Sequence, residues 1–250
     1  MNQSPMLAVT ELSKAFGGVQ AVNLVTFDLK EGELLGIIGP NGSGKTTLVN
    51  LVTGFVRPDS GRVVYKGRNI TGQPPYRVVS FGIARTFQMV RPFYQLPAFK
   101  NLIVPLCSPR VKRLVGGKYG DRAAVALDLL EEVGFERDAY VSYKVASSLP
   151  QGYLKRLELA KSIALRPDLL ILDELFSGLS LAEVASIVPI IEKLRIQGKT
   201  IIMIEHRLKE LFRIADRVMV LNYGRKIAEG PAEEVMENEE VKKAYLGSEE

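Results

Sequence analysis

The segment that most constrains this chain is Gly39-Pro-Asn-Gly-Ser-Gly-Lys45-Thr46, which fits the pattern G-x-x-x-x-G-K-[ST]. It follows a short apolar run, Glu33-Leu-Leu-Gly-Ile-Ile38, that predicts a buried strand, and the residues from Thr46 to Phe55 predict a helix. Glycines between a strand and a helix let main-chain N–H groups wrap a phosphate chain, and the helix N-terminus adds positive potential. The segment therefore predicts a loop that binds the phosphates of a nucleotide.

Two side chains of this loop have specific expected roles. Lys45 should reach the terminal phosphates, and the hydroxyl of Thr46 should ligate Mg²⁺. The residues that we assign to nucleotide binding here are Gly39, Pro40, Asn41, Gly42, Ser43, Gly44, Lys45, Thr46 and Thr47.

Further apolar runs alternate with amphipathic stretches along the chain. Leu169–Leu172, Thr200–Ile204 and Arg217–Leu221 predict buried strands, and the apolar spacing from Ile187 to Leu194 predicts a helix between them. This alternation is typical of a parallel sheet covered by helices. The fold class that we predict is therefore α/β.

Two regions depart from this α/β pattern. Residues 1–30 and 62–70 alternate with period two, as in an antiparallel sheet, whereas residues 98–160 predict helices. We expect a single domain over residues 1–250. Residues 1–90 and 161–230 would form the α/β core with its antiparallel part, residues 91–160 an inserted helical subdomain, and residues 231–250 a C-terminal helical tail.

Two acids follow the strand predicted at Leu169–Leu172. In an open parallel sheet, ligands bind at the carboxyl ends of the strands, so Asp173 is placed to hold Mg²⁺ or its water. Glu174 would then accept a proton from the attacking water as a general base. Acid pairs after strands also serve as helix caps, and this pair alone does not decide between the two roles.

Three other positions point to the same chemistry. His206 is the only histidine and directly follows the strand at Thr200–Ile204, so we expect it to contact a γ-phosphate. Gln88, in Thr86-Phe-Gln88, offers a carbonyl oxygen for Mg²⁺ or the attacking water. The stretch Leu149-Pro-Gln-Gly152 predicts a helix start at a proline, whose N-terminus is another candidate anion site.

Composition removes several classes of protein. One cysteine, Cys107, excludes a disulfide scaffold, and one histidine makes a Cys/His metal site improbable. No apolar run approaches the roughly 20 residues of a membrane span, and the N-terminus lacks the regions of a signal peptide. We therefore expect a cytoplasmic protein.

The order of these motifs resembles that of ATP-binding cassette ATPases over nearly the whole chain. The phosphate loop comes first, followed by Gln88, the glycine-bearing helix start at Gly152, the Asp173–Glu174 pair and His206. The resemblance implies a P-loop NTPase core of the RecA type, with ATP and Mg²⁺ as cofactors. It also implies that Phe16 stacks on the adenine and that Gly152 binds nucleotide.

Finer features resemble the ATPases of branched-chain amino acid importers. Gly82-Ile-Ala-Arg-Thr-Phe-Gln88, with Val90-Arg-Pro-Phe93, looks like their glutamine loop. The tail Glu240-Val-Lys-Lys-Ala-Tyr-Leu-Gly247 looks like theirs too, although a lipopolysaccharide-export ATPase ends similarly. The chain departs from the family in four places, where Pro150 replaces a usual serine, Tyr153 a glutamine, Leu175 a proline and Ser180 an Asp or Asn.

The resemblance implies an ATPase that powers a membrane transporter, most simply an importer of branched-chain or other small hydrophobic amino acids. Its partners would be transmembrane permease subunits and a second cassette ATPase, in a homodimer or, as we favour, a heterodimer. An importer would also have an upstream solute-binding protein. The chain would lie on the inner face of the cell membrane.

Two alternatives stay open, an export-type ATPase and a soluble cassette ATPase acting on nucleic acid. The basic body of the chain, residues 1–230, permits the second, but there is one phosphate loop and no long coiled coil between Gln88 and Asp173. We therefore expect no nucleic acid partner. A GTPase is disfavoured because the chain has no Asn-Lys-x-Asp motif.

Overall fold

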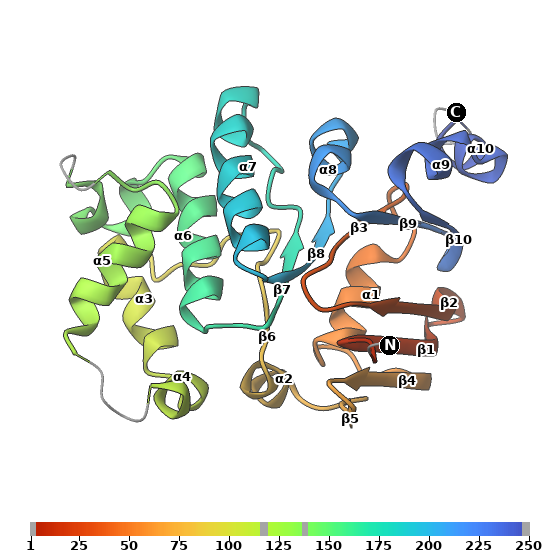
Figure 1. Cartoon of the computed structure of the whole chain (residues 1–250), viewed down its shortest axis with the longest axis horizontal. Coiled ribbons are helices and arrows are strands. Elements are labelled where there is room, and N and C mark those ends of the chain that lie inside the picture. Colours follow the sequence, from red (N-terminus) through yellow and green to blue (C-terminus); the bar gives the residue numbers. More distant parts are fainter. Residues whose placement is uncertain (1–3, 116–119, 137–139, 247–250) are drawn as a thin grey trace. The chain divides into compact units, whose positions relative to one another are not determined.

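The computed structural model describes residues 4–115, 120–136 and 140–246 of the chain. It consists of two compact units, each described here by itself. The first is formed by Met1–Val78 and Gly198–Glu250, and the second by Val79–Gln197. In chain order the second unit is therefore an insertion between the two parts of the first (Figure 1).

The first unit contains two groups of strands. Its strands are β1 (Leu7–Phe16), β2 (Val19–Leu29), β3 (Leu34–Ile38), β4 (Ser60–Tyr65), β5 (Arg68–Asn69), β8 (Thr200–Ile204), β9 (Arg217–Asn222) and β10 (Arg225–Gly230). An antiparallel sheet has the order β2-β1-β4-β5. In the other group β3 lies between β8 and β9, parallel to both, and β10 adds to β9 in the antiparallel direction.

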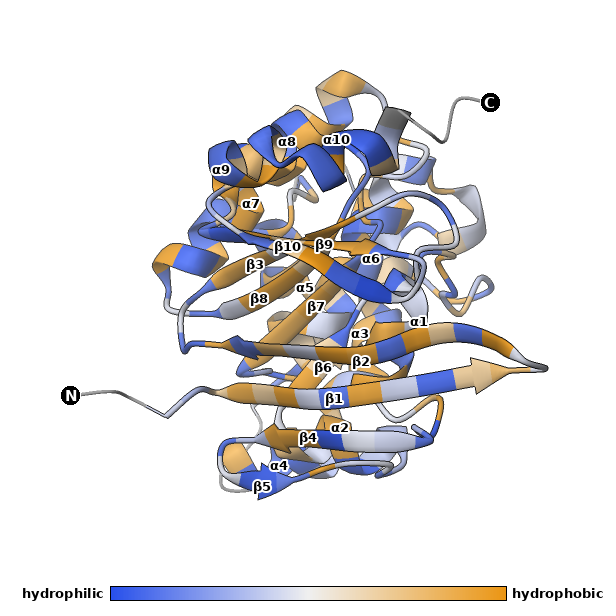
Figure 2. Ribbon diagram, turned by 90° about the vertical axis from the view of Figure 1, so that its right-hand side faces the viewer, coloured by the Kyte–Doolittle hydropathy of each residue, from blue (hydrophilic) through white to orange (hydrophobic). Residues whose placement is uncertain are grey.

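Burial explains the two kinds of strand. Every residue of β3 and β8 is buried, as expected for parallel strands that are covered on both faces. Strands β1 and β2 instead alternate between buried and more exposed residues over much of their length. Figure 2 shows this difference, with β3 and β8 mostly hydrophobic and β1 changing from residue to residue.

The first unit also contains short helices. They are α1 (Lys45–Val52), α8 (Leu208–Ile214), α9 (Ala232–Glu237) and α10 (Glu239–Leu246), and α2 (Pro75–Phe81) runs from the first unit into the second. The loop between β3 and α1 is the glycine-rich segment. Residues 247–250 of the predicted tail, including Gly247, lie outside the described residues.

The second unit is mainly helical. Its elements are β6 (Ile83–Arg85), α3 (Ala98–Leu106), α4 (Pro109–Leu114), α5 (Arg122–Glu132), η1 (Val141–Tyr143), η2 (Ala146–Ser148), α6 (Gln151–Ala164), β7 (Leu169–Asp173) and α7 (Leu181–Ile196). Helix α3 packs against α5 and α6, and β6 pairs with β7 in parallel.

The predicted fold class is confirmed, with parallel strands, an antiparallel β part and an inserted helical region. Helix α7 runs through Pro189 without ending there. Strand β10 is not predicted from the sequence, because its residues are mostly intermediate in burial and give no clear apolar period. The short helices α2 and α8 are not predicted either.

Two glycines of the loop after β3 are required by their surroundings. Gly39 and Gly44 both have positive φ, 147° and 102°. A Cβ atom would overlap the carbonyl oxygen of Leu221 at the first position and that of Ala21 at the second. The main chains of β9 and β2 thus lie so close to the loop that only glycine, which has no Cβ atom, fits at these two positions.

The substitution Gly44→Ala should lower the free energy of unfolding by about 3 kcal/mol, because it combines a disfavoured φ with overlap against main chain. A matched control is Gly198→Ala, at φ 80° with no atom near the added methyl group, for which we expect about 1 kcal/mol. Urea denaturation without nucleotide measures both values. Equal losses in the two variants would contradict the argument from close approach.

Candidate functional site

The glycine-rich loop holds a buried lysine. The ammonium of Lys45 donates hydrogen bonds to the carbonyl oxygens of Gly39 at 2.8 Å and Pro40 at 2.9 Å, and to the hydroxyl of Ser43 at 3.4 Å. Lys45 is only 5% exposed, at the start of α1. The loop thus folds around a positive charge at a helix N-terminus, which is the arrangement that favours a phosphate group. Thr46, the next residue, is exposed.

The last described helix lies beside this loop. A hollow of about 290 Å³ is lined by loop residues and by α10, namely Pro40, Asn41, Gly42, Ser43, Asn222, Tyr223, Glu240, Lys243 and Ala244. Burial raises the pKa of Tyr245 to about 12, against the opposing effect of a hydrogen bond with the main chain of Gly39. No residue of this tail is among the site residues predicted from the sequence.

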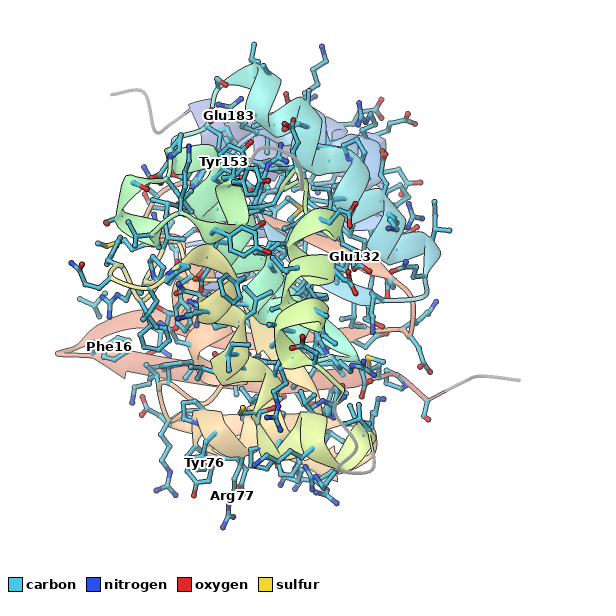
Figure 3. The ribbon with its side chains drawn as sticks, turned by 90° about the vertical axis from the view of Figure 1, so that its left-hand side faces the viewer. Phe16, Tyr76, Arg77, Glu132, Tyr153 and Glu183 are labelled. Atoms are coloured by element: carbon cyan, nitrogen blue, oxygen red, sulfur yellow. The ribbon has the colours of Figure 1, made fainter. Side chains whose placement is uncertain are left out.

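Phe16 and His206 are the other predicted site residues of the first unit. Phe16 ends β1 and is 48% exposed, and the ammonium of Lys14 lies 5.4 Å from its ring centroid. Figure 3 shows Phe16 at the tip of the β1–β2 hairpin. It is therefore not a core aromatic, and its ring is accessible for stacking. His206 is exposed and follows β8 and the buried Glu205.

Asp173 ends β7 in the second unit, where it is 1% exposed. One of its oxygens, Oδ2, accepts a hydrogen bond at 2.7 Å from the Arg85 guanidinium in an ion pair. Burial raises the pKa of Asp173, the Arg85 charge opposes this rise, and the neighbouring Glu174 adds to it. In the part of the chain that the structure describes, the other oxygen, Oδ1, is buried without a hydrogen-bond partner.

The buried Oδ1 of Asp173 suits Mg²⁺ better than a metal ion whose ligands all come from the protein. Mg²⁺ prefers oxygen ligands and usually binds one or two protein groups together with phosphates and waters. The buried Oδ1 of Asp173 is such an oxygen, whereas residues 4–115, 120–136 and 140–246 contain no cluster of three or more His, Cys, Asp or Glu side chains suited to a metal.

Glu174 and Gln88 meet in the second unit. The Gln88 amide Nε2 donates to Glu174 Oε2 at 2.6 Å, although the two residues are 86 positions apart. Glu174 has φ 49°, in the left-handed region that non-glycine residues rarely adopt. The turn after β7 therefore holds the main chain of Glu174 in an unusual conformation. Residues with such disfavoured conformations are often found at functional sites.

Two basic residues beside these acids are not among the site residues predicted from the sequence. Arg85 pairs with Asp173, and Lys155 of α6 donates to the main-chain oxygens of Gln88 and Glu174. The sequence does contain an indication that Lys155 is buried, because it lies at helical spacing from the buried residues Leu159 and Ser162. A lysine within such a buried stripe indicates a specific polar partner.

Comparison with known proteins gives the family. A model described as "ABC transporter" matches residues 22–177, and one described as "Branched-chain amino acid ATP-binding cassette transporter" matches residues 225–250. The high-affinity branched-chain amino acid transport ATP-binding protein LivG of Salmonella typhimurium is 37% identical, over 97% of this chain and 98% of its own length. The corresponding protein BraF of Pseudomonas aeruginosa is also 37% identical, with the same coverage.

Solved structures agree with this result. A nucleotide-free ATP-binding cassette from an ABC transporter superposes with a TM-score of 0.85 at 28% identity, covering 97% of this chain and 99% of that one. The ADP conformation of an ABC transporter cassette gives 0.84 at 29% identity, with 98% and 100% covered.

This chain belongs to the ABC transporter family. It is an ATPase with the nucleotide-binding cassette fold, so the resemblance inferred from the order of motifs is confirmed.

The segment Leu149-Pro-Gln-Gly-Tyr153, called the signature from here on, departs from the usual family sequence at Pro150 and Tyr153 and has a defined structure in the second unit. Pro150 is the N-cap of α6 and makes no side-chain capping bond. The ring of Tyr153 meets Phe135 edge-on with centroids 5.0 Å apart, and the Arg156 guanidinium lies 5.8 Å from its centroid. The tyrosine that stands in place of the usual glutamine therefore packs the start of α6 against Phe135 of the same unit.

Ser180 and Glu183 form a second notable helix start, that of α7. The Ser180 side chain accepts from the N–H of Glu183, whose carboxylate accepts from the N–H of Ser180 at 2.8 Å, completing a capping box. The Ser180 hydroxyl also donates to this carboxylate, at 2.8 Å. The pKa of Glu183 is lowered by its hydrogen bonds from the Ser180 N–H and hydroxyl, and to a lesser extent by one from the main chain of Gly152. Figure 3 labels Tyr153 and Glu183 in this region. The glycine of the cassette's signature thus already has an anionic acceptor in the same chain.

The substitution Arg85→Met should lower the free energy of unfolding by about 3–5 kcal/mol at pH 8, because it leaves a buried carboxylate unpaired. The pKa of Asp173 is already raised in the folded protein. A carboxyl group whose pKa is higher in the folded than in the unfolded state destabilises the protein when it is ionised at high pH, and this destabilisation disappears as the group is protonated at low pH. The deficit should therefore shrink at pH 5. Urea denaturation at both pH values measures it.

Arg85→Lys is the control for this prediction because it keeps the positive charge. We expect it to retain most of the stability at both pH values. A deficit of Arg85→Met that is the same at pH 5 and pH 8 would show that lost packing, and not the charge of Asp173, is the cause.

Proposed function

We propose that this cassette binds ATP on the loop Gly39–Thr47 and hydrolyses it to drive the import of branched-chain or other small hydrophobic amino acids. The observation that carries the nucleotide site is the buried Lys45 ammonium held inside a glycine-rich loop at a helix N-terminus. The solute class is supported by the names of the relatives LivG and BraF and by the model matched at residues 225–250.

The proposed roles divide among nucleotide, water and metal. Residues Gly39–Thr47 and Gly152 bind phosphates, with Lys45 on the terminal ones, and Phe16 stacks on the adenine. Aromatic stacking on a base contributes about 1–3 kcal/mol. Glu174 accepts the proton of the attacking water at its carboxylate, a contribution of about 10²–10⁴ in rate. His206 donates a hydrogen bond to the γ-phosphate.

Thr46, Gln88 and Asp173 are the proposed ligands of Mg²⁺. When bound, this ion would neutralise negative charge on the phosphates. The buried Oδ1 of Asp173 and the hydroxyl of Thr46 supply oxygens for it. Gln88 uses its Nε2 on Glu174, which leaves its carbonyl oxygen at the other end of the amide for the ion or for a water.

The proposed partners are permease subunits, a second cassette ATPase and an upstream solute-binding protein. No helix among residues 4–115, 120–136 and 140–246 is long and apolar enough to cross a membrane. We place the chain at the cytoplasmic face of the membrane, against its permease. The segment 89–99 carries the exposed apolar side chains Met89, Phe93, Tyr94 and Leu96 next to Gln88, and is the proposed receptor for a permease helix.

The domain organisation proposed earlier accompanies this function. Residues 1–90 and 161–230 would act as the catalytic core, residues 91–160 as the signature-bearing subdomain, and residues 231–250 as the tail.

Glu174→Gln and Lys45→Ala should separate binding from hydrolysis. Glu174→Gln keeps the shape of the side chain but removes the base, so we expect it to bind ATP, lose at least 100-fold in turnover, within the usual range of about 10²–10⁴, and accumulate a dimer. Lys45→Ala removes the main phosphate contact and should lose both binding and turnover. A fluorescent ATP analogue measures binding, phosphate release measures turnover, and gel filtration with ATP measures the dimer. Turnover at the wild-type rate in either variant would rule out the role assigned to that residue.

The atypical signature predicts a need for a different partner. Pro150 has no hydroxyl, so one hydrogen bond to a γ-phosphate in the opposite site would be missing, and such bonds to charged groups contribute about 1.5–3 kcal/mol. In a homodimer both sites would lack it, whereas in a heterodimer the partner's signature could complete the phosphate loop of this chain. We therefore favour a heterodimer.

The isolated chain should hydrolyse ATP slowly, and addition of its second ATPase and permease should raise turnover per site several-fold or more. Pro150→Ser should raise the rate of the isolated chain about tenfold by restoring the hydroxyl, whereas Pro150→Ala, without one, should not. Turnover at saturating ATP measures all four cases. A stable ATP-bound homodimer of the unmodified chain, as fast as the complex, would exclude the heterodimer. Branched-chain amino acids that fail to stimulate the complex would contradict the proposed solute.

A further inference from the structure

Lys155 is a buried cation that the proposed reaction does not use. It lies on α6, one helical turn after Gly152, and is only 1% exposed. Removing an ammonium group from water is unfavourable unless hydrogen bonds replace its hydration. Its helical neighbour Leu159 is fully buried, so an apolar side chain could fill such a position without this penalty.

The hydrogen bonds of Lys155 go to the main chain of the two residues at the centre of the proposed chemistry. Its Nζ donates to the carbonyl oxygen of Gln88 at 2.9 Å and to that of Glu174 at 3.0 Å. These residues are 86 positions apart in sequence, and their side chains also meet, Nε2 to Oε2, at 2.6 Å. One ammonium thus joins the glutamine segment to the turn after β7.

The backbone at Glu174 needs such support. At φ 49° its conformation is disfavoured for a residue with a Cβ atom. The carbonyl oxygen of Glu174 accepts from Lys155 and, at 3.2 Å, from the N–H of Ser177. Together these bonds fix the peptide plane that aims the Glu174 carboxylate.

We propose that Lys155 is a positioning residue for hydrolysis, which holds the Gln88 and Glu174 main chains in register so that the Glu174 carboxylate is correctly placed to act on water. The inference rests on the base role proposed for Glu174. Lys155 would act through these two residues and not on the nucleotide itself. Because Lys155 and Gly152 lie on the same helix, α6, the hydrogen bond from Lys155 also links this helix to Glu174, the proposed base.

Lys155→Met tests this role by removing the donor while keeping the length of the side chain. We expect kcat to fall at least 20-fold, with KM and the affinity for a fluorescent ATP analogue changed less than threefold. Lys155→Arg keeps the charge and can donate to two carbonyl groups, so its kcat should be at least fivefold higher than that of Lys155→Met. This split between kcat and KM would not arise from a general loss of folded protein, which is measured separately by circular dichroism.

Lys161→Met is the matched control. Lys161 lies on the same helix and is 19% exposed; it donates to the main-chain oxygen of Arg91 at 3.1 Å and to the carboxylate of Glu158, away from Gln88 and Glu174, at 2.9 Å. We expect its kcat to stay within twofold of the original chain. A similar loss at Lys161 would assign the effect to α6 as a whole and overturn the proposal.

A Lys155→Met variant with kcat within threefold of the original chain would also overturn the proposal, and so would an arginine variant no better than the methionine one. If Lys155→Met does not fold, Lys155→Arg and Lys155→Gln replace the comparison. We then expect kcat of the arginine variant to exceed that of the glutamine variant at least threefold at equal KM, and equal values would overturn the inference.

Glu174→Gln, assayed alongside, separates the two levels of proposal. If Glu174→Gln hydrolyses ATP normally, the base assignment itself has failed. If Glu174→Gln is inactive and Lys155→Met is normal, only the positioning role has failed. In the Glu174→Gln background, Lys155→Met should lower the residual rate less than twofold, since no base is left to position.

Discussion

The buried end of β7 carries two carboxylates in succession, and much of the second unit is arranged around that charge. Burial and the proximity of Glu174 both raise the pKa of Asp173, so the pair would be unfavourable without nearby cations. Arg85 pairs with Asp173, and Lys155 lies close enough to lower the same pKa. The helix that bears the signature thus contributes a charge to the acids, and β6 contributes another.

This arrangement leaves one acceptor of the site uncompensated. Arg85 takes one oxygen of Asp173, while Oδ1 is buried with no hydrogen-bond partner among the described residues. A buried acceptor in that state costs stability, and a cation that arrives with the nucleotide would relieve the cost. In the first unit, the ammonium of Lys45 donates to neutral oxygens inside the glycine-rich loop. The ligands proposed for the two groups, Mg²⁺ for Asp173 and a phosphate for Lys45, each carry the opposite charge.

Much of this could be predicted from sequence because the signals are local. The strands β3, β7 and β8 are continuous apolar runs, and the loop after β3 follows a pattern whose chemistry is known residue by residue. The roles of Arg85 and Lys155 could not be read in this way. Their partners lie 88, 67 and 19 positions away, so only the folded chain shows which oxygens they meet.

Two departures from the family pattern, Ser180 and Pro150, are compatible with the helix starts at which they lie. Serine at position 180 is as good an N-cap as Asp or Asn, and with Glu183 it forms a full capping box, so the exchange preserves the start of α7. Proline at position 150 fits the start of α6 because no helical N–H is lost there. What it removes is a hydroxyl donor, while the Glu183 carboxylate accepts from the N–H of Gly152. Under the proposed function, a phosphate arriving at this helix would have to displace that carboxylate without help from a serine hydroxyl. In the proposed heterodimer this loss would affect one of the two sites, whereas the start of α6 itself keeps its stability.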